Sequence, residues 1–302
     1  MREPGPGRRA LVLAGAGAAG NAWEIGLVAG LAARGVDLTA ADLVVGTSAG
    51  STVAAQVTSG TPAADLYAAI IAEPAAQQSP HRPRHQTGTT PAVRPSGPSY
   101  LEWSDAIIAA SDSPADLRRR LGAAALELAG DDGGEASRRW RAVVASRLPN
   151  HGWPEQHVLV VAVDADTGEP VLLDRASGVE LVDAVAASTS AMTPYRVGGH
   201  RYLNGGYRRS ENADLAAGFE RVVVLSPFSG RSRMPAAWRM DLASQVADLH
   251  ASGSEVRTVF PDARSGDVFD ANALDPATRL PAARGGHEQG RELAAGLADF
   301  WA

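Results

Sequence analysis

The stretch LVVGTSAG, residues 43–50, joins a short apolar run to a serine flanked by glycines. The run at 43–45 is typical of a buried strand, and the small residues at 51–57 suit a closely packed helix. Between them lies the pattern Gly-x-Ser-x-Gly, written here as Gly46-Thr47-Ser48-Ala49-Gly50. In such an elbow the serine occupies a strained turn, and the glycines permit the close backbone approach that the turn requires. The stretch therefore predicts a nucleophilic serine between a strand and a helix.

Another strand, turn and helix are predicted before residues 43–57. The apolar residues 10–14 predict a buried strand, and a helical pattern of apolar residues runs from Trp23 to Leu31. Two such units within about sixty residues are typical of a parallel sheet wrapped by helices. The sequence therefore predicts the α/β class.

The turn between that strand and helix is the run Gly15-Ala16-Gly17-Ala18-Ala19-Gly20, which has three interpretations. It is a dinucleotide fingerprint with Asp37 or Asp42 as the ribose partner, an oxyanion hole built from backbone N–H groups, or a tight turn that binds nothing. The two acids lie before or at the start of the second strand, whereas a ribose-binding acid follows that strand. This position favours the oxyanion hole.

The remaining sequence shows no boundary between domains, so we expect a single domain over residues 1–302. Residues 74–98 are rich in Pro, Gln, Thr and Arg, and predict a mobile loop or a lid. The other expected elements are helices within 100–148, a strand at 158–163 with a hairpin partner at 171–173, a helix at 180–188, a strand at 222–225 and a C-terminal helix at 288–301.

Composition excludes several classes of site. The chain has no cysteine, so disulfides, zinc–thiolate sites and cysteine nucleophiles are impossible. Net charge is -6 and the basic residues are scattered, which argues against nucleic-acid binding. The sequence offers no histidine spacing typical of a zinc site, and no apolar run approaches the roughly 20 residues of a spanning helix. We expect a cytoplasmic protein without a metal, associated with membranes at most peripherally.

Three blocks of the sequence together resemble one known family. They are the glycine run with Trp23-Glu24-Ile25-Gly26 after it, the elbow at 46–50, and the segment 182–206, where Ala187-Ser188, Pro194 and Asn204-Gly205-Gly206 follow one another. This arrangement is similar to the patatin-like phospholipases and acyl hydrolases. The resemblance implies a three-layer α/β/α fold with a central, mostly parallel sheet, and a serine–aspartate dyad that uses neither histidine nor a cofactor.

The resemblance also implies roles for particular residues. Ser48 is the expected nucleophile, and the turn Gly205-Gly206 is expected to present the residue at position 204 to it. The expected oxyanion donors are the N–H groups of Gly15, Ala16 and Gly17.

This chain departs from the family pattern at several positions. Ala19 replaces a basic residue of the loop, and Ala14 and Ala16 replace glycines, but backbone N–H donors survive these changes. The more serious departure is Asn204, which stands where the dyad aspartate is expected. A neutral amide cannot act as a base. Two explanations stay open: a deliberate substitution that stops turnover, and natural divergence toward binding.

We therefore expect a serine acyl hydrolase or acyltransferase that acts on an ester or thioester and is impaired in this form. Its partners would be an acyl substrate, a lipid or small molecule, or an acyl carrier protein; the sequence leaves the oligomeric state open. The alternatives are a non-catalytic acyl-ligand-binding or regulatory protein and, third, a dinucleotide-binding protein. An ordinary α/β-hydrolase would instead need a late histidine such as His250 or His287.

Overall fold

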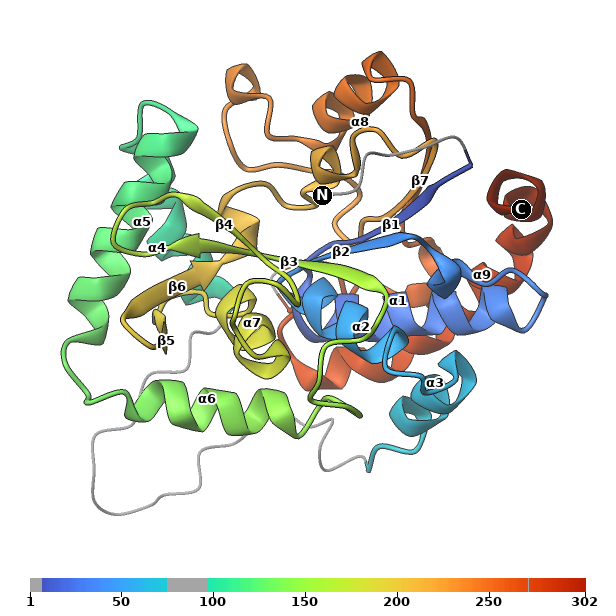
Figure 1. The fold of residues 1–302 in the computed structure, drawn as a ribbon, viewed down its shortest axis with the longest axis horizontal. Helices are drawn as coiled ribbons and strands as arrows, with labels where there is room; N and C mark the ends of the chain where they lie inside the picture. The colour runs from blue at the N-terminus through green and yellow to red at the C-terminus, as the bar shows by residue number, and fades with distance from the viewer. Residues whose placement is uncertain (1–6, 75–96, 271) are drawn as a thin grey trace.

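The computed structural model describes residues 7–74, 97–270 and 272–302, and its centre is an eight-stranded sheet (Figure 1). The strand order is β5-β6-β3-β2-β1-β7-β8, with β4 paired to β3 off this path. The parallel strands are β1 (Arg9–Leu13), β2 (Leu43–Thr47), β3 (His157–Asp164), β7 (Arg221–Leu225) and β8 (Glu255–Val259). Antiparallel pairing adds β4 (Pro170–Leu173), β6 (His200–Asn204) and β5 (Tyr195–Val197).

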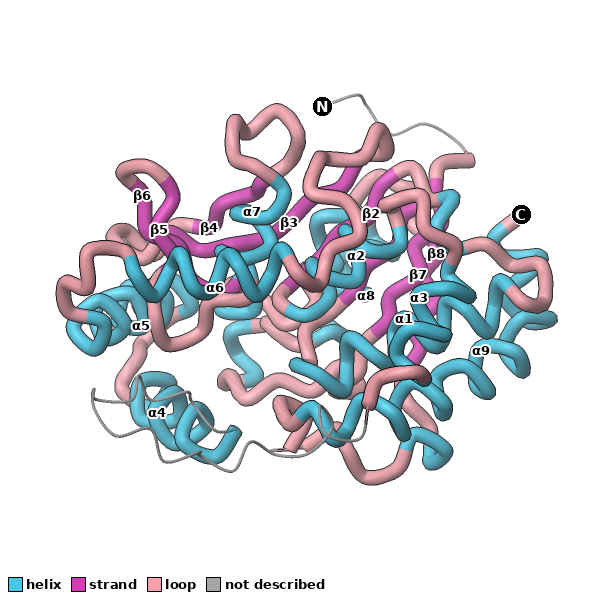
Figure 2. Tube along the Cα trace, turned by 90° about the horizontal axis from the view of Figure 1, so that it is seen from below, coloured by secondary structure: helices cyan, strands magenta, loops and turns pink. Residues whose placement is uncertain are grey.

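Helices cover both faces of this sheet, which confirms the three-layer α/β/α class. One face packs against α1 (Gly17–Ala32), α2 (Ala49–Val57), α3 (Ala63–Ile71), α6 (Glu135–Ala145), α7 (Leu181–Ser188) and α9 (Arg279–Trp301). The other face packs against α4 (Gly97–Ala109), α5 (Pro114–Ala129) and α8 (Leu242–Ala251). Seen from below, α6, α2 and α1 cross in front of the strands (Figure 2).

Strand β1 shows why the sequence of the central strands reads as continuous apolar runs. Leu11 and Leu13 contact the cluster on the α1 side, whereas Ala10 and Val12 contact the cluster on the α8 side. Successive side chains of a strand point to opposite faces. When helices cover both faces, no position faces solvent, so polar residues do not alternate with apolar ones. The strands expected at 10–14, 43–45, 158–163 and 222–225 all form for this reason.

Strand β3 has two edges, and its pairing register decides how the elements around it meet. On one edge, β4 pairs with residues 160–163. The other edge is shared by two strands end to end: β2 pairs in parallel up to Thr47 opposite Val161, and β6 pairs antiparallel from Asn204 opposite Ala162. The carboxyl ends of β2 and β6 therefore meet head to head, which brings Ser48 and Asn204 together.

Helix α9 begins at Arg279, nine residues before the start expected from the sequence, so the boundary at 288 is wrong. The first half of α9 contains Pro281, Gly285 and Gly286, which normally interrupt a helix. Pro281 lies in the first turn, where its missing N–H costs no intrahelical hydrogen bond. The α9 glycines permit close packing on α1, because a Cβ at Gly286 would lie 2.4 Å from the Trp23 carbonyl oxygen.

Two other expectations concern the loop at 74–98 and membrane-spanning helices. The expected loop or lid at 74–98 lies outside the described residues, except for residue 74 and residues 97–98, which begin α4. Within the described part of the chain, no helix has both the length and the apolar character required to cross a bilayer.

Replacing Gly30 by alanine tests the close contact between α1 and α9. A Cβ at this position would lie 2.1 Å from the His287 carbonyl oxygen, so one helix must shift. We expect the Gly30→Ala variant to lose about 1–3 kcal/mol of unfolding free energy, measured by urea denaturation. Gly296 is the matched control, because it lies on α9 with no atom near its absent Cβ. Gly296→Ala should be neutral or stabilising by up to about 1 kcal/mol; equal effects of the two changes would contradict the close-packing account.

Candidate active site

Ser48 lies in the tight turn between β2 and α2, with φ 53° and ψ -124°. A non-glycine residue with this backbone is strained, and strain of this kind is concentrated at functional sites. The turn packs tightly on β1, since a Cβ at Gly50 would lie 2.2 Å from the Leu13 carbonyl oxygen. The Ser48 N–H donates to Ser188 Oγ over 2.9 Å. Residues 46–50 therefore form a strained strand-to-helix turn that is hydrogen-bonded to the end of α7.

Asn204 faces Ser48 from the end of β6. Its Nδ2 donates to Ser48 Oγ over 2.8 Å, and its Oδ1 accepts from the Gly206 N–H over 2.8 Å. The backbone N–H can only donate, so the atom facing it must be the oxygen, and the NH₂ group must face the serine. Both side chains are half-buried. Asn204 therefore donates a hydrogen bond to the Ser48 hydroxyl and does not accept one from it.

The glycine run lies beside the same serine. A Cβ at Gly15 would lie 2.7 Å from Ser48 Cβ and 3.3 Å from its Oγ. Helix α1 begins at Gly17, so residues 17–20 form its first turn and not the loop that the sequence suggested. Among the described residues, the N–H groups of Gly15 and Ala16 have no hydrogen-bond partner. Both residues line the same cavity as Ser48.

A buried acid supports the base of this loop. Glu24 on α1 is fully buried, and its Oε1 accepts from the Ala14 N–H over 2.9 Å. Burial raises the pKa of this carboxyl well above its ordinary value, although the Ala14 hydrogen bond lowers it. Burial therefore favours the uncharged form of Glu24, and its hydrogen bond fixes the residue before Gly15.

Ser48, Asn204 and residues 15–18 open into one cavity of about 1290 Å³. Apolar side chains supply much of its wall; they include Leu66, Ile70, Tyr100, Ile108, Trp140, Phe228, Met234, Phe269 and Leu274. Some charged residues of the lining pair with each other: Arg279 makes a bidentate ion pair with Glu73. The cavity is thus an apolar chamber with the serine and glycine loop in its wall.

Other residues considered from the sequence lie elsewhere. Asp42 accepts from the Arg9 N–H at the amino end of the strands, opposite the glycine loop, and Asp37 caps the turn at Thr39. No histidine of the described chain lines the cavity, so His250 and His287 lie away from Ser48. In the described ranges no group of three or more histidine, aspartate or glutamate side chains forms a metal site.

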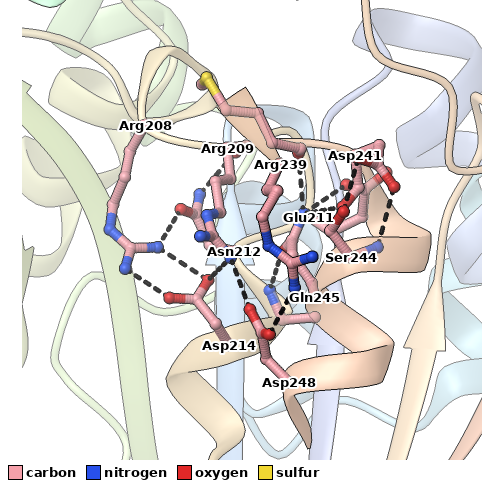
Figure 3. A network of polar contacts seen from close by, with 12 residues as sticks. Arg208, Arg209, Glu211, Asn212, Asp214, Arg239, Asp241, Ser244, Gln245 and Asp248 are labelled. Atoms are coloured by element: carbon pink, nitrogen blue, oxygen red, sulfur yellow. Dashed lines mark hydrogen bonds and ion pairs between the residues drawn. The ribbon is translucent and has the colours of Figure 1, made fainter. Parts of the chain in front are cut away.

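The sequence reasoning missed a buried polar network behind the elbow (Figure 3). Glu211 accepts from Ser226 Oγ over 2.9 Å and from Gln245 Nε2 over 3.3 Å. Its backbone carbonyl accepts from Thr47 Oγ1, next to Ser48. The only sequence signal of this network is the polar character of residues 208–214, and polar residues between a turn and a strand usually indicate a solvated loop. Burial raises the pKa of Glu211 to about 7, while the hydrogen bonds from Ser226 and Gln245 lower it.

Two comparisons with known proteins give a match. A family model described as patatin-like phospholipase matches residues 11–217. A solved structure, VipD from Legionella pneumophila, matches with a TM-score of 0.44 and 14% sequence identity, over 97% of this chain and 68% of that chain. A search of curated proteins finds no match.

The raised pKa of Glu211 predicts a pH dependence of stability. Folding favours the protonated carboxyl, so this contribution is fully present below the ordinary value of 4.5 and is lost as pH rises to about 7. Relative to Glu211→Gln, the unchanged protein should lose on the order of 3 kcal/mol of unfolding free energy across that window. Urea denaturation at several pH values measures this. Glu255→Gln, an exposed change on β8, is the control; a Glu211→Gln curve parallel to that of the unchanged protein would refute the assignment.

Proposed function

Because this chain belongs to the patatin-like phospholipase family, we propose that it is a serine acyl hydrolase or acyltransferase whose nucleophile is Ser48 and whose dyad is interrupted at Asn204. The observation that carries the proposal is the contact of 2.8 Å between Asn204 Nδ2 and Ser48 Oγ. An aspartate of the same shape would keep the Gly206 N–H on one oxygen and turn the other oxygen to the serine. That oxygen would accept the hydroxyl proton.

With aspartate at position 204, the reaction has two halves. Ser48 Oγ attacks the acyl carbonyl while its proton passes to the carboxylate, and the N–H groups of Gly15, Ala16 and Gly17 stabilise the oxyanion. The bond to the alcohol or thiol then breaks, and the leaving group takes the proton. Water or another acceptor attacks the acyl-serine with residue 204 again as the base, which releases the product and restores Ser48.

The chain as it stands lacks the proton acceptor of both halves. Asn204 donates to the Ser48 oxygen, so the hydroxyl is not made more nucleophilic. We therefore propose that this form turns over slowly. The glycine loop and the strained elbow need no change for activity, because they work through backbone N–H groups and backbone shape.

The apolar wall of the cavity supports a substrate with a hydrocarbon acyl chain. An ester or a thioester fits the chemistry of Ser48 equally, so the leaving group is a lipid alcohol, a small alcohol or the thiol of an acyl carrier. A second candidate is acyl-ligand binding without turnover, which is favoured by the same donor geometry at Asn204. The two candidates differ in whether restoring a carboxylate restores chemistry.

Three forms of the protein test this proposal: unchanged, Asn204→Asp and Asn204→Ala. The measurement is the rate of hydrolysis of p-nitrophenyl esters of increasing chain length. We expect Asn204→Asp to raise turnover by up to ~10⁴-fold, because it supplies the missing base. Asn204→Ala should stay slow, since it removes the donor without supplying an acceptor.

Labelling with a fluorophosphonate probe is the companion measurement. Asn204→Asp should react at Ser48, and Ser48→Ala in the same background should not react. If all three forms hydrolyse equally, position 204 is not the partner of Ser48. If Asn204→Asp neither hydrolyses ester nor is labelled, the enzyme proposal fails and acyl-ligand binding remains.

A further inference from the structure

Asn212 lies behind the elbow, fully buried and in the left-handed backbone region with φ 57°. Its Oδ1 accepts from Arg208 Nη1 over 2.7 Å (Figure 3). A guanidinium can only donate, so this contact fixes which end of the amide is oxygen and aims the NH₂ group at the elbow. Arg208 is itself held by Asp214, through bonds of 3.0 and 2.6 Å. The orientation of the Asn212 amide is therefore set by an ion pair.

The NH₂ group of Asn212 reaches both halves of the site. It donates to Thr47 Oγ1 over 3.0 Å and to the Gly205 carbonyl over 3.2 Å, with the Arg209 carbonyl as a further acceptor at 2.8 Å. Thr47 is the residue before Ser48, and Gly205 is the residue after Asn204. One side chain thus contacts the neighbours of both members of the dyad.

Such a link matters because β2 and β6 do not pair with each other. Both are bonded to the same edge of β3 and only meet at their ends. We infer that Asn212 is a positioning residue that sets the separation of Ser48 from residue 204 by tying Thr47 to Gly205. The inference rests on the proposed function, since it concerns the same dyad. Asn212 does not line the cavity, so its effect is on chemistry and not on substrate binding.

The test uses Asn204→Asp as the parent protein and compares Asn212→Gly with Asn212→Asp. Glycine accepts the left-handed backbone without strain and removes every side-chain bond. Aspartate keeps the shape and the Arg208 contact but has no proton to donate. We expect both variants to lower kcat by about 10- to 100-fold with KM nearly unchanged, because a small misplacement of reacting groups is that costly. A residue that serves only the backbone turn would leave kcat of Asn212→Gly unchanged, which would overturn the inference.

Two further variants separate positioning from loss of stability. Ser226→Ala, in the same buried network, removes bonds to Glu211 and to the Gly230 N–H without touching Thr47 or Gly205. It should lower Tm and leave kcat unchanged. Thr47→Val removes one acceptor of Asn212, so its effect on kcat should not add to that of Asn212→Gly. Additive losses, or an equal loss of kcat in Ser226→Ala, would contradict the link.

A crystal structure of Asn212→Gly in the otherwise unchanged chain gives a readout independent of turnover. We expect the 2.8 Å contact of Ser48 Oγ with Asn204 Nδ2 to lengthen beyond hydrogen-bonding range. An unchanged distance overturns the positioning role, whatever the activity. Absence of turnover and of labelling in Asn204→Asp overturns the proposed function alone, and the crystallographic distance then still decides the role of Asn212.

Discussion

The edge of β3 that β2 and β6 share is the constraint on which the site depends. A strand has only two edges, and β4 occupies the other one along residues 160–163. The parallel β2 and the antiparallel β6 must therefore fit one after the other on the remaining edge. Their carboxyl ends can only face each other, and the residue that follows β2 and the residue that ends β6 become neighbours. A distance of 156 residues in the chain is thereby reduced to one hydrogen bond of 2.8 Å.

The hydrogen bonds around this junction are directional, and their direction decides the chemistry. The Gly206 N–H fixes the amide oxygen of Asn204, and the amide nitrogen then has to face Ser48. Ser48 has a strained backbone and lines a largely apolar cavity, and among the described residues the N–H groups of Gly15 and Ala16 have no hydrogen-bond partner. The proposed acyl transfer uses all three features. The replacement of one oxygen by one nitrogen changes an acceptor into a donor while the shape is kept. Under the proposed function, recognition of an acyl group depends on the shape of the site, and catalysis depends on a proton acceptor at position 204.

The two sides of the elbow have opposite character. Toward the cavity the wall is largely apolar, whereas behind the elbow Glu211, Asn212 and Gln245 belong to a buried polar network (Figure 3). Ser226, which donates to Glu211, is buried with them. Buried polar groups of this kind are costly when unpaired and directional when paired. Within this network, Asn212 is the member whose side chain contacts both Thr47 and Gly205, the neighbours of Ser48 and Asn204. Glu24 serves the glycine loop in a similar way, as a buried acid whose hydrogen bond fixes the backbone before Gly15.

The sequence by itself determined the parts that depend on local pattern. Apolar runs with glycine turns predicted the parallel strands, and Gly-x-Ser-x-Gly predicted the elbow, because strand burial and turn strain act within a few residues. It misplaced the start of α9, because the α9 glycines suggested an interruption of the helix, whereas in the structure they allow α9 to pack closely on α1. It did not reveal Ser188 under the elbow, or Asn212 and Glu211 behind it, because polar residues give no sign of which distant atoms will pair with them. Only the tertiary structure decided those partners. Strand register and helix packing determine which hydrogen-bonding groups lie within about 3 Å of one another, and both depend on several distant segments of the chain at once.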